Sequence, residues 1–166
     1  TPFRYFIQHL GAPGEEFDER RMEAGFNSLE ELSLFARQRG VEILLENIPN
    51  GFSSAEQLGY FLEATHLDLG YCFDVGHAHL NEGIGAAFAL MKDRIRSTHV
   101  HDNDGESDLH LLPFLGTGGT IDWGETMKLL RTRADQYPLL LELREKEDEP
   151  RPLDGLRRIF DKLEAI

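Results

Sequence analysis

Short apolar runs alternate with longer amphipathic stretches along the chain, and this alternation constrains the fold more than any other feature. Five apolar runs have the length of buried strands, at residues 5–7, 41–45, 69–73, 95–100 and 139–141. Between them apolar residues recur at spacings of three and four, which predicts amphipathic helices. Strict alternation of strands and helices indicates a parallel sheet with helical crossovers. The sequence therefore predicts an α/β fold of about five β-α units.

Two architectures accommodate these units. A five-stranded open parallel sheet of the flavodoxin type suits a chain of 166 residues. The other is a partial (β/α)8 TIM barrel, since a complete barrel normally takes about 250 residues. We expect residues 1–166 to form one domain, and the residues at the strand ends favour the barrel.

A side chain that can bind a metal ion stands at or just past the end of every predicted strand. These side chains are His9, Glu46, Asp74, His99 and Glu142. In parallel α/β folds this edge collects ligands and catalytic groups, because the loops there converge. Three carboxylates and one imidazole suit Mn²⁺, Mg²⁺, Co²⁺ or Zn²⁺. Burying three carboxylates together without a cation would be strongly unfavourable. We therefore expect Glu46, Asp74, His99 and Glu142 to share one ion.

A second group of candidate ligands follows two of these strands. His77 lies one turn past Asp74, and Asp108 and His110 lie on one face of an extended loop. Together they are candidates for a second ion, which the two imidazoles would make more zinc-like. The alternatives are a hydrogen bond from His77 to a substrate hydroxyl, and a solvated loop around Asp108 and His110.

Composition narrows the function classes. The net charge is −13, from 17 basic and 30 acidic residues, which makes DNA an unlikely substrate class because DNA binders neutralise phosphates. No apolar run approaches the roughly 18–20 residues that a membrane span needs. The single cysteine, Cys72, excludes an internal disulfide and fits a reducing compartment. We expect a cytoplasmic protein.

Five segments, LLENIPN, CFDVGHAH, THVHDNDG, SDLHLLPFLGTG and LLLELRE, occur in this order. Together they resemble the xylose isomerase-like TIM-barrel superfamily, which holds sugar isomerases and epimerases and the endonuclease IV type of apurinic-site nuclease. The resemblance assigns the shared metal site to Glu46, Asp74, His99 and Glu142. It selects His99 rather than His101, because family members read His-x-x-Asp here.

The nuclease branch of this superfamily implies more ligands. There His77, Asp108 and His110 would hold another zinc, and His9 would join Glu46 at a third. The nuclease's remaining histidine comes from an earlier strand, for which this chain has no segment. Because the family barrel has eight strands, the resemblance implies at least two further N-terminal β-α units. The chain is then a truncated barrel, or a copy of itself or another chain completes it.

Three functions follow as hypotheses. The first is a divalent-metal-dependent isomerase or epimerase of a small sugar, sugar phosphate or hydroxy-ketone, in which Glu46 and Glu142 move a proton through a metal-stabilised enediolate. The second is an endonuclease IV-like zinc phosphodiesterase acting on apurinic-site DNA. The third is a non-catalytic, metal-binding barrel fragment. His101 and Arg144 are weaker candidates for contacts with the substrate.

Overall fold

The computed structural model describes residues 3–132, 138–145 and 151–166. Its centre is one five-stranded sheet, in which neighbouring strands pair in parallel. The strands are β1 (Tyr5–Gln8), β2 (Glu42–Glu46), β3 (Gly70–Asp74), β4 (Ile95–Val100) and β5 (Leu139–Leu141). All five predicted strands are therefore confirmed, each within one residue at either end.

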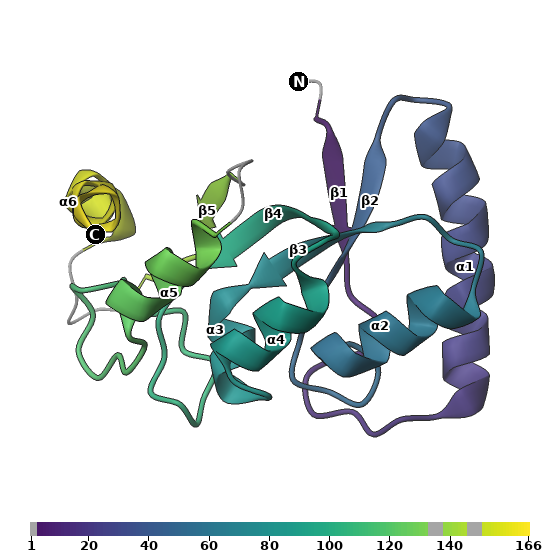
Figure 1. The fold of residues 1–166 in the computed structure, drawn as a ribbon, viewed down its shortest axis with the longest axis horizontal. Helices are drawn as coiled ribbons and strands as arrows, with labels where there is room; N and C mark the ends of the chain where they lie inside the picture. The colour runs from purple at the N-terminus through teal and green to yellow at the C-terminus, as the bar shows by residue number, and fades with distance from the viewer. Residues whose placement is uncertain (1–2, 133–137, 146–150) are drawn as a thin grey trace.

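The order of the strands in the sheet separates the two predicted architectures. The strands lie side by side in sequence order, β1-β2-β3-β4-β5, whereas a flavodoxin-type sheet changes direction after its first strand. The helices follow one another in an arc along the sheet (Figure 1). Sequential parallel strands with helical crossovers are the arrangement of a TIM barrel. The fold is thus a partial (β/α)8 barrel of five β-α units.

Six helices are described, namely α1 (Glu19–Arg37), α2 (Ala55–Ala64), α3 (Val75–Leu80), α4 (Ile84–Met91), α5 (Trp123–Leu130) and α6 (Pro152–Ala165). Short polar side chains begin several of them by accepting a backbone N–H of the first turn, as Asp18 does for α1 and Ser54 for α2. The short helix α3 is not predicted as a separate element, because its sequence has no apolar periodicity long enough to show it. Asp74 is both the last residue of β3 and the N-cap of α3, so the helix follows the strand without a loop.

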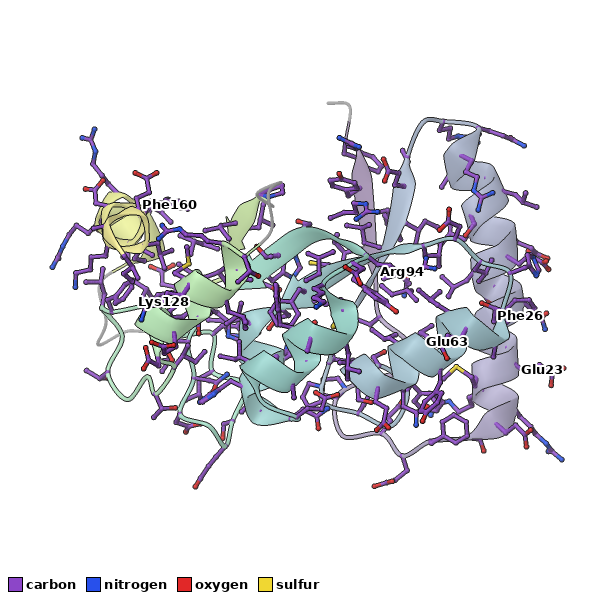
Figure 2. The ribbon with its side chains drawn as sticks, in the orientation of Figure 1. Glu23, Phe26, Glu63, Arg94, Lys128 and Phe160 are labelled. Atoms are coloured by element: carbon purple, nitrogen blue, oxygen red, sulfur yellow. The ribbon has the colours of Figure 1, made fainter. Side chains whose placement is uncertain are left out.

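The hydrophobic core lies between the sheet and these helices. Alternate strand residues point into it, among them Ile43, Leu45, Tyr71, Phe73 and Ile95. The helices present apolar side chains to the same core. On α1, Phe26 packs against the core, whereas Glu23 points to solvent (Figure 2). The candidate ligands at the ends of β2 and β3 belong to the opposite face of the sheet.

The outer edges of the sheet carry exposed apolar side chains. Beside β1, Phe3, Phe6 and Phe35 are 62%, 43% and 54% exposed and line an apolar groove together with Val41 and Ile43. Beside β5, Leu140 is also exposed. None of the helices in the described ranges combines the length and the apolar character that crossing a bilayer requires.

Candidate metal centre

The ends of four neighbouring strands bring the first set of predicted ligands together. Glu46 and Asp74 are the last residues of β2 and β3, His99 lies opposite Asp74 on β4, and Glu142 directly follows β5. Each offers one ligand atom, and these atoms all lie within 4.8 Å of one another. A parallel sheet produces this convergence because all its strands end at the same edge.

His99 lies at the middle of this group. Its Nδ1 is 3.0 Å from Glu46 Oε1 and 2.9 Å from Glu142 Oε2, and 3.9 Å from Asp74 Oδ2. Burial alone would lower the pKa of His99, but hydrogen bonds with Cys72, Glu142 and Glu46 outweigh it and hold that pKa well above its usual range. This environment favours the imidazolium form of His99, whose charge offsets the neighbouring carboxylates.

The pKa values of two neighbouring carboxylates, Glu46 and Glu142, are shifted in the opposite direction. Burial would raise the pKa of Glu46, yet hydrogen bonds from His77, His9 and His99 hold it far below its usual range. The hydrogen bond from His99 likewise lowers the pKa of Glu142. Both carboxylates are therefore ionised and able to bind a cation, in competition with the proton on His99.

The donor set and one orphaned atom test whether a metal ion fits. Asp74 has no exposed surface, and its Oδ2 has no hydrogen-bond partner within the described residues. A buried carboxylate oxygen without a donor is costly, and a cation would remove that cost. Three carboxylates and one imidazole are a hard-to-borderline donor set, so the residues fit a divalent ion such as Mn²⁺ or Zn²⁺.

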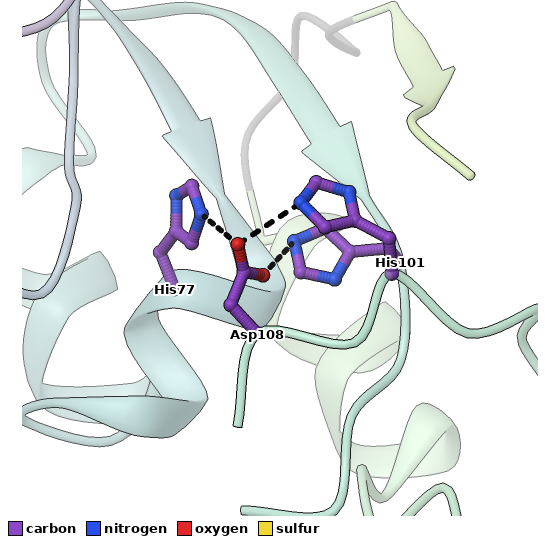
Figure 3. A group of neighbouring side chains, drawn as sticks. His77, His101 and Asp108 are labelled. Atoms are coloured by element: carbon purple, nitrogen blue, oxygen red, sulfur yellow. Dashed lines mark hydrogen bonds and ion pairs between the residues drawn. The ribbon is translucent and has the colours of Figure 1, made fainter. Parts of the chain in front are cut away.

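A second cluster lies beside the first and contains His77, His101, Asp108 and His110. Their ligand atoms again lie within 4.8 Å of one another. Asp108 is central: its Oδ2 is 3.7 Å from His77 Nε2, and its Oδ1 is 3.8 Å from His101 Nε2 (Figure 3). Asp108 Oδ2 is also 3.1 Å from His110 Nε2. Asp108 Oδ1 is another buried oxygen without a hydrogen-bond partner among the described residues. This cluster therefore also fits a cation, with more imidazole than the first.

The charges in the second cluster are coupled in the same way. Burial would lower the pKa of His77, but hydrogen bonds with Asp108 and Glu46 outweigh it and raise that pKa to about 10. Burial would raise the pKa of Asp108, but His110 and His77 hold it far below its usual range. Asp108 is thus an ionised carboxylate among histidines.

Sequence reasoning missed Asn47, which joins the two clusters. Its side chain donates to the Asp74 carbonyl at 2.9 Å and accepts from the Asp74 N–H at 2.8 Å. Its own carbonyl accepts a hydrogen bond from His77 Nδ1 at 2.9 Å, which leaves His77 Nε2 free to face Asp108. Asn47 directly follows a strand that ends on a candidate ligand, but the sequence gives no sign of these partners.

Asp102 belongs to a family motif in the sequence, and the structure gives it a structural role. Its buried carboxylate accepts the backbone N–H groups of Asn103, Thr120 and Ile121 at 2.8, 3.1 and 3.2 Å, and the Trp123 indole N–H at 2.7 Å. These contacts join the start and the end of the long loop 103–121. Asp102 therefore holds in place the loop that carries Asp108 and His110.

The remaining candidates lie around these clusters. His9 stands beside Glu46, with its Nε2 3.0 Å from Glu46 Oε2, and is apart from the second cluster. Arg144 donates to the Asp108 carbonyl at 3.3 Å, so its guanidinium contacts the loop. His101 has no exposed surface, and its Nε2 lies 3.1 Å from Asp74 Oδ1. His101 is thus a buried member of the second cluster that reaches a carboxylate of the first, and it does not lie at an exposed surface.

Comparison with known proteins identifies the family to which this fold belongs. A family model described as xylose isomerase-like TIM barrel matches residues 4–163. The uncharacterized protein y4fM of Sinorhizobium fredii is 31% identical over 121 residues, which cover 70% of this chain and 38% of that protein.

Two solved structures are also similar. One, described as a D-tagatose 3-epimerase-like protein, aligns with a TM-score of 0.74 at 22% identity. The alignment covers 98% of this chain and 64% of that protein. The other, the TTHB071 protein from Thermus thermophilus soaked with ZnCl2, aligns with a TM-score of 0.62 at 28% identity. The alignment covers 97% of this chain and 61% of that protein. The chain thus spans less than two thirds of each of these proteins.

Proposed function

The chain belongs to the xylose isomerase-like TIM-barrel family, and on that basis we propose that it carries the metal-binding part of an isomerase or epimerase. The substrate class is a small sugar, a sugar phosphate or a hydroxy-ketone, and the cofactor is Mn²⁺ or Zn²⁺, with Mg²⁺ and Co²⁺ as alternatives. One observation carries the proposal: three carboxylates and an imidazole converge within 4.8 Å at the catalytic edge of the sheet.

Glu46, Asp74, His99 and Glu142 would hold the ion. When bound, a divalent cation would act as a Lewis acid toward a substrate carbonyl and so make a neighbouring C–H more acidic. Glu46 and Glu142 come from the ends of strands separated by β3 and β4, and one oxygen of each lies beside His99 Nδ1, at 3.0 and 2.9 Å. Glu142, whose side chain is 45% exposed, would take the proton from one carbon. Glu46, which is ionised beforehand, would deliver a proton to the next carbon after receiving one from Glu142 or from solvent, so that neither carboxylate gains or loses a proton over the cycle.

A second candidate, an endonuclease IV-like zinc phosphodiesterase, is favoured by one feature. The histidine-rich cluster around Asp108 would bind zinc, and clustered zinc ions activate water for phosphodiester hydrolysis. The net charge of −13 opposes it, because an apurinic-site substrate is a polyanion. We therefore rank it second.

We propose further that additional β-α units cover the edges of the sheet and complete the barrel. The exposed Phe3, Phe6 and Phe35 beside β1 have the apolar character of a face that packs against a neighbouring unit. Those units would come from the rest of a longer chain, from a second copy or from a partner chain. Light scattering tests this: a stable monomer of 18.9 kDa with a cooperative melt would contradict it.

Metal analysis and proton exchange test the proposed chemistry. Protein purified without chelator should contain one Mn or Zn ion per chain, or one Mg or Co ion as the alternative. It should also catalyse deuterium exchange from solvent into a ketose, followed by NMR. Glu142→Gln should abolish the exchange, whereas Glu145→Gln, an exposed position three residues further, should not. Two or three zinc ions per chain would favour the phosphodiesterase. Full exchange in Glu142→Gln would remove Glu142 from the mechanism.

A further inference from the structure

His101 is a fully buried histidine of the second cluster that also contacts the first cluster. Its Nε2 lies 3.1 Å from Asp74 Oδ1, an atom of the first cluster. Its ring stacks on His110 of the second cluster, with ring centroids 4.0 Å apart and planes inclined by 15°. A polar ring held without any exposed surface needs a hydrogen-bonding role to offset its desolvation.

The hydrogen bonds of Asp74 indicate that role. Oδ1 lies 2.6 Å from the His77 backbone N–H and 3.1 Å from His101 Nε2, whereas Oδ2 is buried and without a partner among the described residues. Two donors on one oxygen fix the rotation of the carboxylate. They leave Oδ2 as the oxygen directed toward His99, whose Nδ1 is 3.9 Å away.

The distances favour His101 as a donor to Asp74 rather than as a ligand of a second ion. Its Nε2 is 3.1 Å from Asp74 Oδ1. The same atom is farther, at 3.8 Å, from Asp108 Oδ1 (Figure 3). An Nε2 that carries a hydrogen toward a carboxylate has no lone pair for a cation. The other ring nitrogen, Nδ1, lies at the longer distance of 3.4 Å from the Asp102 carbonyl.

The neighbouring helix is shaped to admit this ring. A Cβ built on Gly76 in α3 would collide with the ring atoms of His101. Gly76 adopts an ordinary helical conformation, so the need for glycine here is the space for His101 and not the backbone. Residue 76 thus offers a way to displace the ring without changing any candidate ligand.

We propose that His101 is a positioning residue of the first metal site, whose Nε2–H holds the Asp74 carboxylate so that Oδ2 faces the cation. The inference rests on the proposed metal site but not on the proposed reaction. Outer hydrogen bonds of this kind typically change metal affinity by about 10–100-fold.

A pair of variants of equal length tests the donor. In His101→Gln the amide nitrogen reaches the position of Nε2 and still donates, whereas His101→Met has the same length and no donor. Titration with Mn²⁺, with free Mn²⁺ measured by EPR, should give a Kd for His101→Gln within about threefold of wild type and for His101→Met about 10–100-fold weaker. Equal affinities of the two variants would overturn the proposal, whether both match the wild type or both are weakened. Absence of Mn²⁺ binding by the wild type would overturn it as well.

A second pair guards against misfolding of His101→Met. Gly76→Ala should weaken Mn²⁺ binding because the new methyl group displaces the His101 ring. Gly59→Ala is the control: Gly59 lies in α2, a Cβ there would meet open space, and this variant should bind Mn²⁺ as the wild type does. Equal binding by these two alanine variants would also overturn the proposal. All these measurements are Mn²⁺ affinities. They therefore test the role of His101 even if the protein shows no isomerase activity.

Discussion

Replacing Asp102 with asparagine should loosen the loop that carries Asp108 and His110. The carboxylate accepts four N–H groups, three on Oδ1 and the Trp123 indole on Oδ2. An amide has one oxygen, so in either orientation its NH2 group faces a buried N–H. Losing a hydrogen bond to a charged acceptor and leaving a donor unpaired should cost about 2–4 kcal/mol. For a protein of this size that corresponds to a decrease in Tm of roughly 4–16 °C.

The chain's single tryptophan, Trp123, reports directly on this contact. Urea denaturation of Asp102→Asn, followed by tryptophan fluorescence, gives the free energy of unfolding. Asp104→Asn is the matched control in the same loop, because Asp104 is exposed and its Oδ1 accepts two backbone N–H groups that an amide oxygen can also accept. If Asp102→Asn is destabilised no more than Asp104→Asn, the role assigned to Asp102 is wrong.

Three further predictions concern stability and the metal site. Asn47→Ala leaves the N–H and the carbonyl of Asp74 without their side-chain partner, and should lower the free energy of unfolding by about 2–4 kcal/mol in a urea titration. The control Asn27→Ala, on the exposed side of α1, should have little effect in the same titration. The pKa of His77 is raised to about 10. Its ion pairs should therefore stabilise the metal-free protein fully below about pH 6.5, and this contribution should be lost as the pH rises toward 10. Urea titrations across that range should record the loss, and a free energy of unfolding that does not change with pH would contradict it. Saturation with Mn²⁺ at 100 times its Kd should stabilise the protein by about 2.7 kcal/mol, so a Tm unchanged by EDTA would argue against a structural contribution of the ion.

The strands and the first ligand set were predictable because both depend on local patterns. A buried strand is a short apolar run, and the residue that ends it lies at the catalytic edge of a parallel sheet whatever its neighbours are. The positions of Glu46, Asp74, His99 and Glu142 therefore follow from the sequence. Their roles as ligands remain a prediction, since they rest on chemistry that metal analysis has to test.

The choice between an open sheet and a partial barrel needed the tertiary structure. Strand lengths and alternation are the same in both, and the difference is which strand lies beside which. The order β1-β2-β3-β4-β5 decided it. That order depends on long-range pairing, which no local pattern records.

The contacts that orient the site also came from the tertiary structure alone. Asn47 acts on Asp74 across 27 residues of sequence, Asp102 on Trp123 across 21, and His101 on Asp74 across 27. An asparagine or histidine at a strand end has the same local sequence whether it binds a metal, a substrate or a neighbouring carboxylate. The sequence by itself determined which residues reach the edge of the sheet. Only the tertiary structure determined which of them contact one another, because hydrogen bonds between strand ends require the folded register of the whole sheet.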